Sequence, residues 1–104
     1  MKKIKVYLDD ERTMPPTFDI HVKTPEEAID LLKQGIVESI SLDHDLGLIP
    51  DDRNGNMVAK FIEEHAYLGD LDRIVWCLHT ANPAGRLNMF QALTKADEYW
   101  SLRE

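Results

Sequence analysis

Three short apolar runs in this chain each stop at a polar cluster, and this pattern limits the fold more than any other feature. Such runs have the length and composition of β-strands. The runs and the residues that follow them are 4–8 before Asp9 and Asp10, 38–42 before Asp43, His44 and Asp45, and 74–78 before His79. The continuous apolarity of the last run is typical of a buried parallel strand. Residues 18–22 alternate in polarity and predict one more strand.

Helical patterns fill most of the intervals between these strands. Residues 24–27 (TPEE) have the order of an N-cap, a first-turn proline and a capping-box glutamate, and Gly35 follows as a terminator. Apolar residues recur at helical spacing over residues 58–65 and again over residues 89–100. The interval between the first two strands contains Pro15-Pro16, which excludes a regular helix there.

Strands that alternate with helices predict a three-layer α/β fold, in which a parallel sheet of about four strands carries about three helices on its two faces. With 104 residues, of which 43% are hydrophobic, residues 1–104 should form a single domain. Ligands of such sheets bind at the carboxyl ends of the strands. We therefore expect the three polar clusters to meet at one edge of the sheet.

The net charge of −7 is largely local. Seven of the 19 acidic residues, accompanied by two arginines, lie in two short stretches, and they are Asp9, Asp10, Glu11, Asp43, Asp45, Asp51 and Asp52. This concentration indicates a site, and the overall sign argues against non-specific binding to duplex DNA. The chain has one cysteine, Cys77, and no apolar run near the ~20 residues of a membrane span, so we expect a cytoplasmic protein without a membrane segment.

Carboxylates at two strand ends predict a site for a divalent cation. Like charges in one cleft raise one another's pKa unless a cation neutralises them. Carboxylate oxygens suit Mg²⁺ or Mn²⁺. We therefore expect Asp9, Asp10 and Asp43 to hold a metal, while ordinary solvated loops are the alternative for each of these acids taken alone.

Two histidines at the same edge are candidates for proton transfer. Histidine side chains in general titrate near neutral pH, so His79 and His44 could serve as general acid and base, alongside Asp43 and with Asp45 orienting a histidine. Strand alternation predicts that Asp43 and Asp45 point together and that His44 points away. A satisfied surface or core histidine is the alternative in each case.

Neutral and basic side chains nearby are candidates for binding phosphate oxygens. Thr80 and Asn82 follow the last strand, and Arg86 lies in the first turn of the last helix, where anions are favoured. Helix capping is the alternative function of Asn82. Arg12 could bind substrate or neutralise a neighbouring aspartate.

The sequence resembles a known family, the cyclic-phosphate-processing receiver-like domains. This family is a reduced relative of two-component receiver domains, so the resemblance implies a receiver-like, flavodoxin-like fold. The resemblance rests on motifs that recur in order along nearly the whole chain. They are Leu8-Asp9-Asp10-Glu11-Arg12, residues 24–28 (TPEEA), residues 41–47 (SLDHDLG), Asn54-Gly55, residues 79–83 (HTANP), Gly85-Arg86 and Asn88-Met89.

The resemblance implies roles for several residues. Asp9 and Asp10 match the acidic metal-binding pair of receivers, Asp43 matches the phospho-accepting aspartate, and Thr80-Ala81 matches the switch step. The sequence departs from receivers in lacking the pattern of a fifth strand with the receiver lysine and the helix between the first two strands. His44, Asp45, His79 and Asn82 are additions.

These observations lead to one main hypothesis and two alternatives. The main hypothesis is a metal-dependent phosphoesterase that opens a cyclic phosphate on a nucleotide or an RNA end, with Mg²⁺ or Mn²⁺ as cofactor. The first alternative is a non-catalytic receiver-like module that binds metal or phosphate, or takes a phosphoryl group on Asp43. The second is an interaction protein whose acidic edge docks on a basic protein partner.

Overall fold

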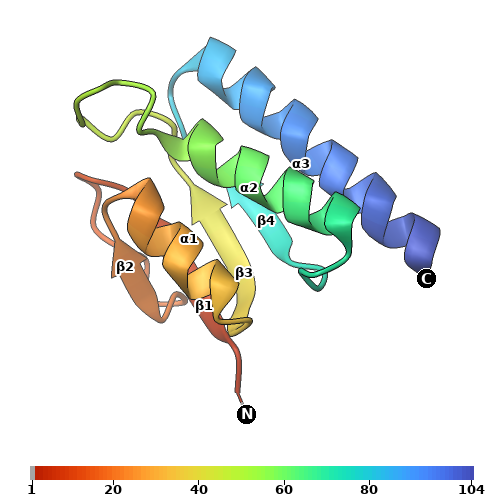
Figure 1. Cartoon of the computed structure of the whole chain (residues 1–104). Helices are drawn as coiled ribbons and strands as arrows, with labels where there is room; N and C mark the ends of the chain where they lie inside the picture. The colour runs from red at the N-terminus through yellow and green to blue at the C-terminus, as the bar shows by residue number, and fades with distance from the viewer. Residues whose placement is uncertain (1) are drawn as a thin grey trace.

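Residues 2–104, which the computed structural model describes, form four parallel strands and three helices (Figure 1). The strands lie in the order β2-β1-β3-β4. The elements are β1 (Ile4–Leu8), β2 (Ile20–Val22), α1 (Pro25–Lys33), β3 (Val37–Leu42), α2 (Gly55–Leu68), β4 (Val75–Leu78) and α3 (Pro83–Arg103). The predicted receiver-like α/β fold, a parallel sheet of four strands with three helices, is thus confirmed.

Local sequence signals account for the bounds of the helices. Thr24 caps α1 by accepting a hydrogen bond from the N–H of Glu27 (3.2 Å), and Pro25 occupies the first turn. Asn54 and Asn82 cap α2 and α3 in the same way. Gly69 ends α2 with φ +82°, a left-handed conformation that glycine adopts without strain.

The second strand is shorter than residues 18–22, the range predicted from alternation, and it covers Ile20–Val22. Asp19 precedes the strand and closes a turn-like contact with β1. Its carboxylate accepts a hydrogen bond from the N–H of Lys5 (2.8 Å), and its own N–H donates to the carbonyl of Lys5 (2.8 Å). The Asp19 side chain thus binds the backbone N–H of Lys5, which would otherwise be available for strand pairing.

All three helices lie on one face of the sheet, as Figure 1 shows, so the expected covering of both faces is wrong. The steps from β2 to β3 and from β3 to β4 run in the same direction across the sheet. Right-handed crossovers therefore place α1 and α2 on the same side. The step from β1 to β2 runs in the opposite direction, and a helix there would cover the other face; residues 9–19 form none.

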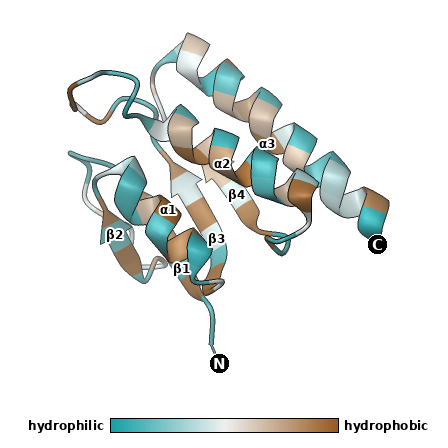
Figure 2. Ribbon diagram, viewed as in Figure 1, coloured by the Kyte–Doolittle hydropathy of each residue, from teal (hydrophilic) through white to brown (hydrophobic). Residues whose placement is uncertain are grey.

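The hydrophobic core fills the space between the sheet and this single helix layer. On α1, the side that faces the viewer in Figure 2, away from the sheet, is mostly hydrophilic. The strands contribute Val6, Leu8, Val22, Ile40 and Leu42, and the helices contribute Ala28, Leu32, Val58, Ile62, Met89 and Leu93. Among residues 2–104, no helix has the length and apolar character needed to cross a bilayer.

The opposite face of the sheet has no helix layer. On β4, Val75 is 68% exposed and Cys77 is also exposed, whereas Trp76 and Leu78, on the helix side, are partly buried. Tyr7, Ser41 and Cys77 are neighbours across β1, β3 and β4 and form one row on this open face. The row leads directly to the carboxyl edge of the sheet.

Candidate functional site

Asp9, Asp43 and His79 occupy equivalent positions, each immediately after a strand. Their backbone N–H groups continue the sheet by donating to the carbonyls of the neighbouring strands, at 3.1 Å for Asp9 and 3.0 Å for Asp43 and His79. Because side chains alternate along a strand, each of the three lies on the same side as the residue two positions earlier. All three therefore lie on the open face, in the row that follows Tyr7, Ser41 and Cys77.

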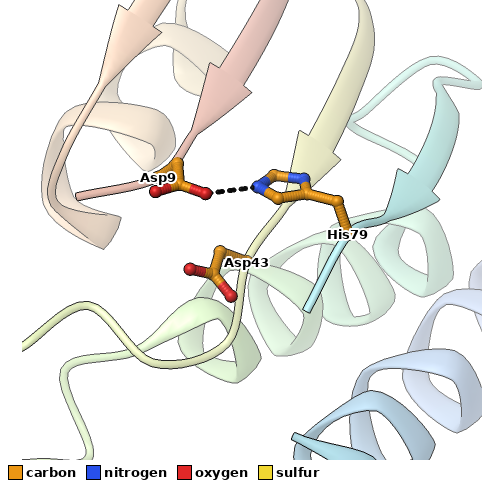
Figure 3. Close-up of side chains that lie close together, drawn as sticks. All are labelled: Asp9, Asp43 and His79. Atoms are coloured by element: carbon orange, nitrogen blue, oxygen red, sulfur yellow. Dashed lines mark hydrogen bonds and ion pairs between the residues drawn. The ribbon is translucent and has the colours of Figure 1, made fainter. Parts of the chain in front are cut away.

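The three side chains converge on one point (Figure 3). One ligand-type atom from each, a carboxylate oxygen of Asp9, one of Asp43 and a ring nitrogen of His79, lie within 4.8 Å of one another. His79 Nε2 lies 2.9 Å from Asp9 Oδ2. The expected meeting of the polar clusters at one edge of the sheet is thus found in the structure.

Asp9 is fully buried and saturated with hydrogen-bond donors. Its Oδ1 accepts from the N–H groups of Arg12 (2.7 Å) and Glu11 (2.8 Å), and its Oδ2 accepts from Arg12 Nη1 (2.9 Å). Burial on its own would raise the pKa of Asp9, but these hydrogen bonds and that of His79 outweigh burial and lower the pKa to about 2. Asp9 is therefore ionised throughout the neutral range.

Asp43 lies in a different electrostatic setting. Burial, followed by the nearby charge of Asp9, raises its pKa above 3.8, against the opposing hydrogen bond from the N–H of His44 (2.8 Å). Two carboxylates with pKa values shifted in opposite directions are typical of sites that use acid–base or metal chemistry. Gly55 lets the start of α2 pass close to this residue, because a Cβ there would overlap with the Asp43 carbonyl.

His79 is held by contacts on both of its ring nitrogens and on its face. Nδ1 lies 2.7 Å from Ser41 Oγ, and the ring of Tyr7 stacks on the imidazole at 4.5 Å between centroids and 7° between planes. Burial lowers the pKa of His79, although the Asp9 contact acts in the opposite direction, so the ring is neutral at neutral pH. The imidazole is therefore held in one orientation at the edge of the site.

A cleft of about 370 Å³ opens over this group. It is lined by Asp9, Asp10, Glu11, Arg12, Asp43, Asp45, Gly47, Thr80 and Ala81. The Arg12 guanidinium reaches across it, 2.9 Å from Asp9 Oδ2 and 3.4 Å from Asp43 Oδ2. The positively charged side chain of Arg12 thus bridges the carboxylates of Asp9 and Asp43.

The donor set fits a divalent cation. Two carboxylates and an imidazole nitrogen within 4.8 Å are ligands that suit Mn²⁺, and carboxylates with water suit Mg²⁺. The position of Arg12 between Asp9 and Asp43 shows that this point attracts positive charge. Asp10, the third expected ligand, lines the cleft but stands apart from the converging group, with its Oδ2 close to Gly47.

The second histidine belongs to a separate group. His44 Nδ1 lies 2.8 Å from Asp45 Oδ1, and Asn82 Nδ2 donates to the same carboxylate at 3.2 and 3.3 Å. The imidazole rests on the first turn of α3, where a Cβ on Gly85 would overlap with its ring. Among residues 2–104, neither His44 nor His79 is one of those that line the cleft.

The candidate phosphate-binding residues are divided between these two places. Arg12 and Thr80 line the cleft. A hydrogen bond from Thr80 opposes the effect of burial, which raises the pKa of Asp43. Asn82 caps α3 by accepting from the N–H of Gly85 (3.0 Å). Arg86 donates to the carbonyl of Leu78 (3.2 Å) and is exposed. The catalytic, metal and phosphate roles of all these residues stay predictions.

Three residues of the site escaped the sequence reasoning: Ser41, Tyr7 and His21. Ser41 and Tyr7 support the ring of His79, and His21 Nε2 lies 2.7 Å from the carbonyl oxygen of Asp9. A signal for the first two was present, because Tyr7 and Ser41 each stand two residues before an aspartate at a strand end. This signal was not recognised because helices were expected on both faces of the sheet.

The family comparison agrees with the fold and with this edge of the sheet. A family model described as "Cyclic-phosphate processing Receiver domain" matches residues 4–95, which extend from β1 into α3. The match includes each of the residues at the site described above. A comparison with curated proteins gave no match.

Proposed function

The chain belongs to the family of cyclic-phosphate processing receiver domains, and from that premise we propose that it hydrolyses a cyclic phosphodiester on a nucleotide or an RNA end with the help of Mg²⁺ or Mn²⁺. The observation that carries this proposal is the convergence of Asp9, Asp43 and His79 beneath a cleft that Arg12 spans. Acids, a histidine and an arginine are the groups that phosphoryl chemistry requires.

The proposed reaction balances as a hydrolysis. The oxygen of water forms a bond to phosphorus, one ring P–O ester bond breaks, and the product is a linear phosphate monoester. The proton that water loses goes to the solvent, and the leaving sugar oxygen takes up a proton. His79, which lies beside Asp9 at the base of the cleft, is the group proposed to deliver that proton from its imidazolium form, and the ring then returns to the neutral state.

The chain's own residues would divide the remaining tasks. Asp9 and Asp43 would hold the divalent cation. Such a cation, when bound, offsets both negative charges, polarises the phosphate and lowers the pKa of a bound water. Arg12 and Thr80 would bind phosphate oxygens, since both line the cleft and a guanidinium matches phosphate geometry.

The convergence of the acids supports a site over a dispersed acidic docking surface. Five of them line the same cleft, and they are Asp9, Asp10, Glu11, Asp43 and Asp45. The non-catalytic alternative is favoured by one observation, the bridge that Arg12 makes between Asp9 and Asp43, which offsets part of their negative charge without a metal. A receiver that takes a phosphoryl group on Asp43 should gain the mass of that group when treated with acetyl phosphate and Mg²⁺.

Turnover of 2′,3′-cyclic nucleotides and of RNA with a 2′,3′-cyclic phosphate end tests the proposal. We expect a linear monoester in the presence of Mn²⁺ or Mg²⁺, and a loss of about a hundredfold or more in Asp43→Asn and His79→Gln. Asp52→Asn, in an exposed loop outside the cleft, is the matched control and should retain activity. No turnover with either metal, or full activity in Asp43→Asn, would contradict the proposed hydrolysis.

A further inference from the structure

The hydrogen-bond partners of His79 determine where its proton lies. Nε2 faces Asp9 Oδ2 at 2.9 Å, and the Asp9 carboxylate already accepts three hydrogen bonds from Glu11 and Arg12, as an ionised carboxylate does. An ionised carboxylate only accepts hydrogen bonds, so Nε2 must carry the proton. In the neutral ring Nδ1 is then an acceptor, which requires a donor on that side.

Ser41 is placed to be that donor. Its Oγ lies 2.7 Å from Nδ1, and the residue is only 3% exposed. A serine hydroxyl can donate a hydrogen bond to the unprotonated nitrogen of a neutral imidazole. A buried Nδ1 without this partner would carry an unsatisfied acceptor.

The ring of Tyr7 restricts the orientation of the His79 imidazole. It stacks on His79 nearly in parallel, at 7°, and Phe18 and His21 pack against Tyr7 at 5.2 and 5.5 Å between centroids. Tyr7 is itself 5% exposed, so it cannot turn aside without disrupting its neighbours. The plane of the imidazole and the direction of its Nε2 toward Asp9 are therefore held by two residues of the open sheet face.

We propose that Ser41 and Tyr7 are positioning residues that hold His79 in the tautomer with the proton on Nε2, so that this N–H donates to Asp9 Oδ2 and fixes the carboxylate at the cleft. This inference rests on the proposed hydrolysis for its catalytic part only. The preference for one tautomer is a property of the metal-free protein and can be measured without substrate.

Long-range proton–nitrogen NMR spectra of the metal-free protein, with isotope-labelled histidine, give the direct test. The His79 signals are assigned by their loss in His79→Gln. We expect a protonated Nε2 and an unprotonated Nδ1 in the wild type. Ser41→Ala should shift the Nδ1 resonance, and Ser41→Thr, which keeps a hydroxyl, should restore it. A proton on Nδ1 in the neutral ring, or an unmoved resonance in Ser41→Ala, would overturn the proposal.

Kinetics with a 2′,3′-cyclic nucleotide supply the second readout. We expect kcat to fall about a hundredfold in Ser41→Ala with little change in KM, and to recover in Ser41→Thr, because misplacement of a reacting group affects the chemical step. Tyr7→Phe keeps the stacked ring and is the control for Tyr7→Leu, which removes it. An active Ser41→Ala with the wild-type kcat would contradict the positioning, while the absence of any turnover would contradict the proposed hydrolysis and leave the spectra to decide the tautomer.

Discussion

Two histidine–aspartate groups lie side by side at the carboxyl edge of the sheet, and their surroundings differ. His79 pairs with the fully buried Asp9, beneath a cleft, and the open sheet face supports its ring. His44 pairs with Asp45, whose side chain is 68% exposed, and its ring packs on the start of α3. The same residue types thus form part of the candidate site in one place and connect the loop after β3 to the start of α3 in the other. Burial and the direction of the ring, rather than residue type, make this difference.

The largest expected effect on stability concerns Gly85, which packs against His44 in the second of these groups. A Cβ there would overlap with the imidazole of His44, so Gly85→Ala must displace that ring or the helix. We expect the free energy of unfolding to fall by about 3 kcal/mol, the cost of overpacking a tight contact. In an ordinary helix position glycine to alanine would stabilise. Urea unfolding measures the change.

The double variant His44→Ala/Gly85→Ala is the control for that prediction. Without the imidazole, the added methyl group at position 85 should cost little relative to His44→Ala alone, because the two residues are in contact and their effects are not additive. A destabilisation by Gly85→Ala that is equal in both backgrounds would show that His44 is not the obstacle. The signals of His79 should stay unchanged in both variants.

The acid dependence of stability should distinguish the buried aspartate of the first group. Folding lowers the pKa of Asp9 from 3.8 to about 2. A lowered pKa means that the stabilisation by this carboxylate is complete above about pH 4 and is lost as the pH falls through about 2, which amounts to about 2 kcal/mol. Urea unfolding from pH 7 to pH 2 measures it.

Asp9→Asn should flatten the lower part of that stability profile, while Asp52→Asn, in an exposed loop, should retain the wild-type shape. Identical profiles of the wild type and Asp9→Asn below pH 4 would show that the hydrogen bonds of Arg12, Glu11 and His79 do not stabilise the ionised carboxylate as the structure indicates.

A smaller effect is expected at Asn82, which links the second group to α3. Its Oδ1 caps the helix through the N–H of Gly85, and its Nδ2 donates to Asp45. Asn82→Ala should lower the free energy of unfolding by about 1 kcal/mol through loss of the cap. Asn82→Ser, which restores a capping oxygen but not the contact with Asp45, should recover most of it. Equal losses in both variants would assign the stability to the Asp45 contact instead.

The smallest expected change has the opposite sign and concerns Asp43. Because burial raises the pKa of this carboxyl group, its ionised form is unfavourable in the folded protein. Asp43→Asn should therefore slightly increase stability at pH 7, even though it removes the proposed activity, and the increase should vanish below about pH 4. Asp45→Asn is the matched comparison and should give no increase, since the hydrogen bond with His44 lowers the pKa of Asp45.

Much of the fold follows from the sequence because its signals are local. The strand Ile4–Leu8 was predicted with its observed bounds, and Thr24, Pro25 and Gly69 begin or end helices where their chemistry requires it. The approach of Asp9, Asp43 and His79 was also predictable, since parallel strands end at the same edge. The bare second face was not predicted, because which face a helix covers depends on the direction of each crossover and not on any one segment.

The sequence by itself determined the residue types, their place after the strands and the family motifs that link this chain to cyclic-phosphate processing receiver domains. Only the tertiary structure decided which of the two histidines stands with Asp9 and Asp43, since His44 instead rests on Gly85. It also decided that Ser41 and Tyr7 support the ring of His79. The physical reason is that strand order and register bring together residues as far apart as 9 and 79. Local sequence patterns do not predict contacts between residues that lie so far apart in the chain.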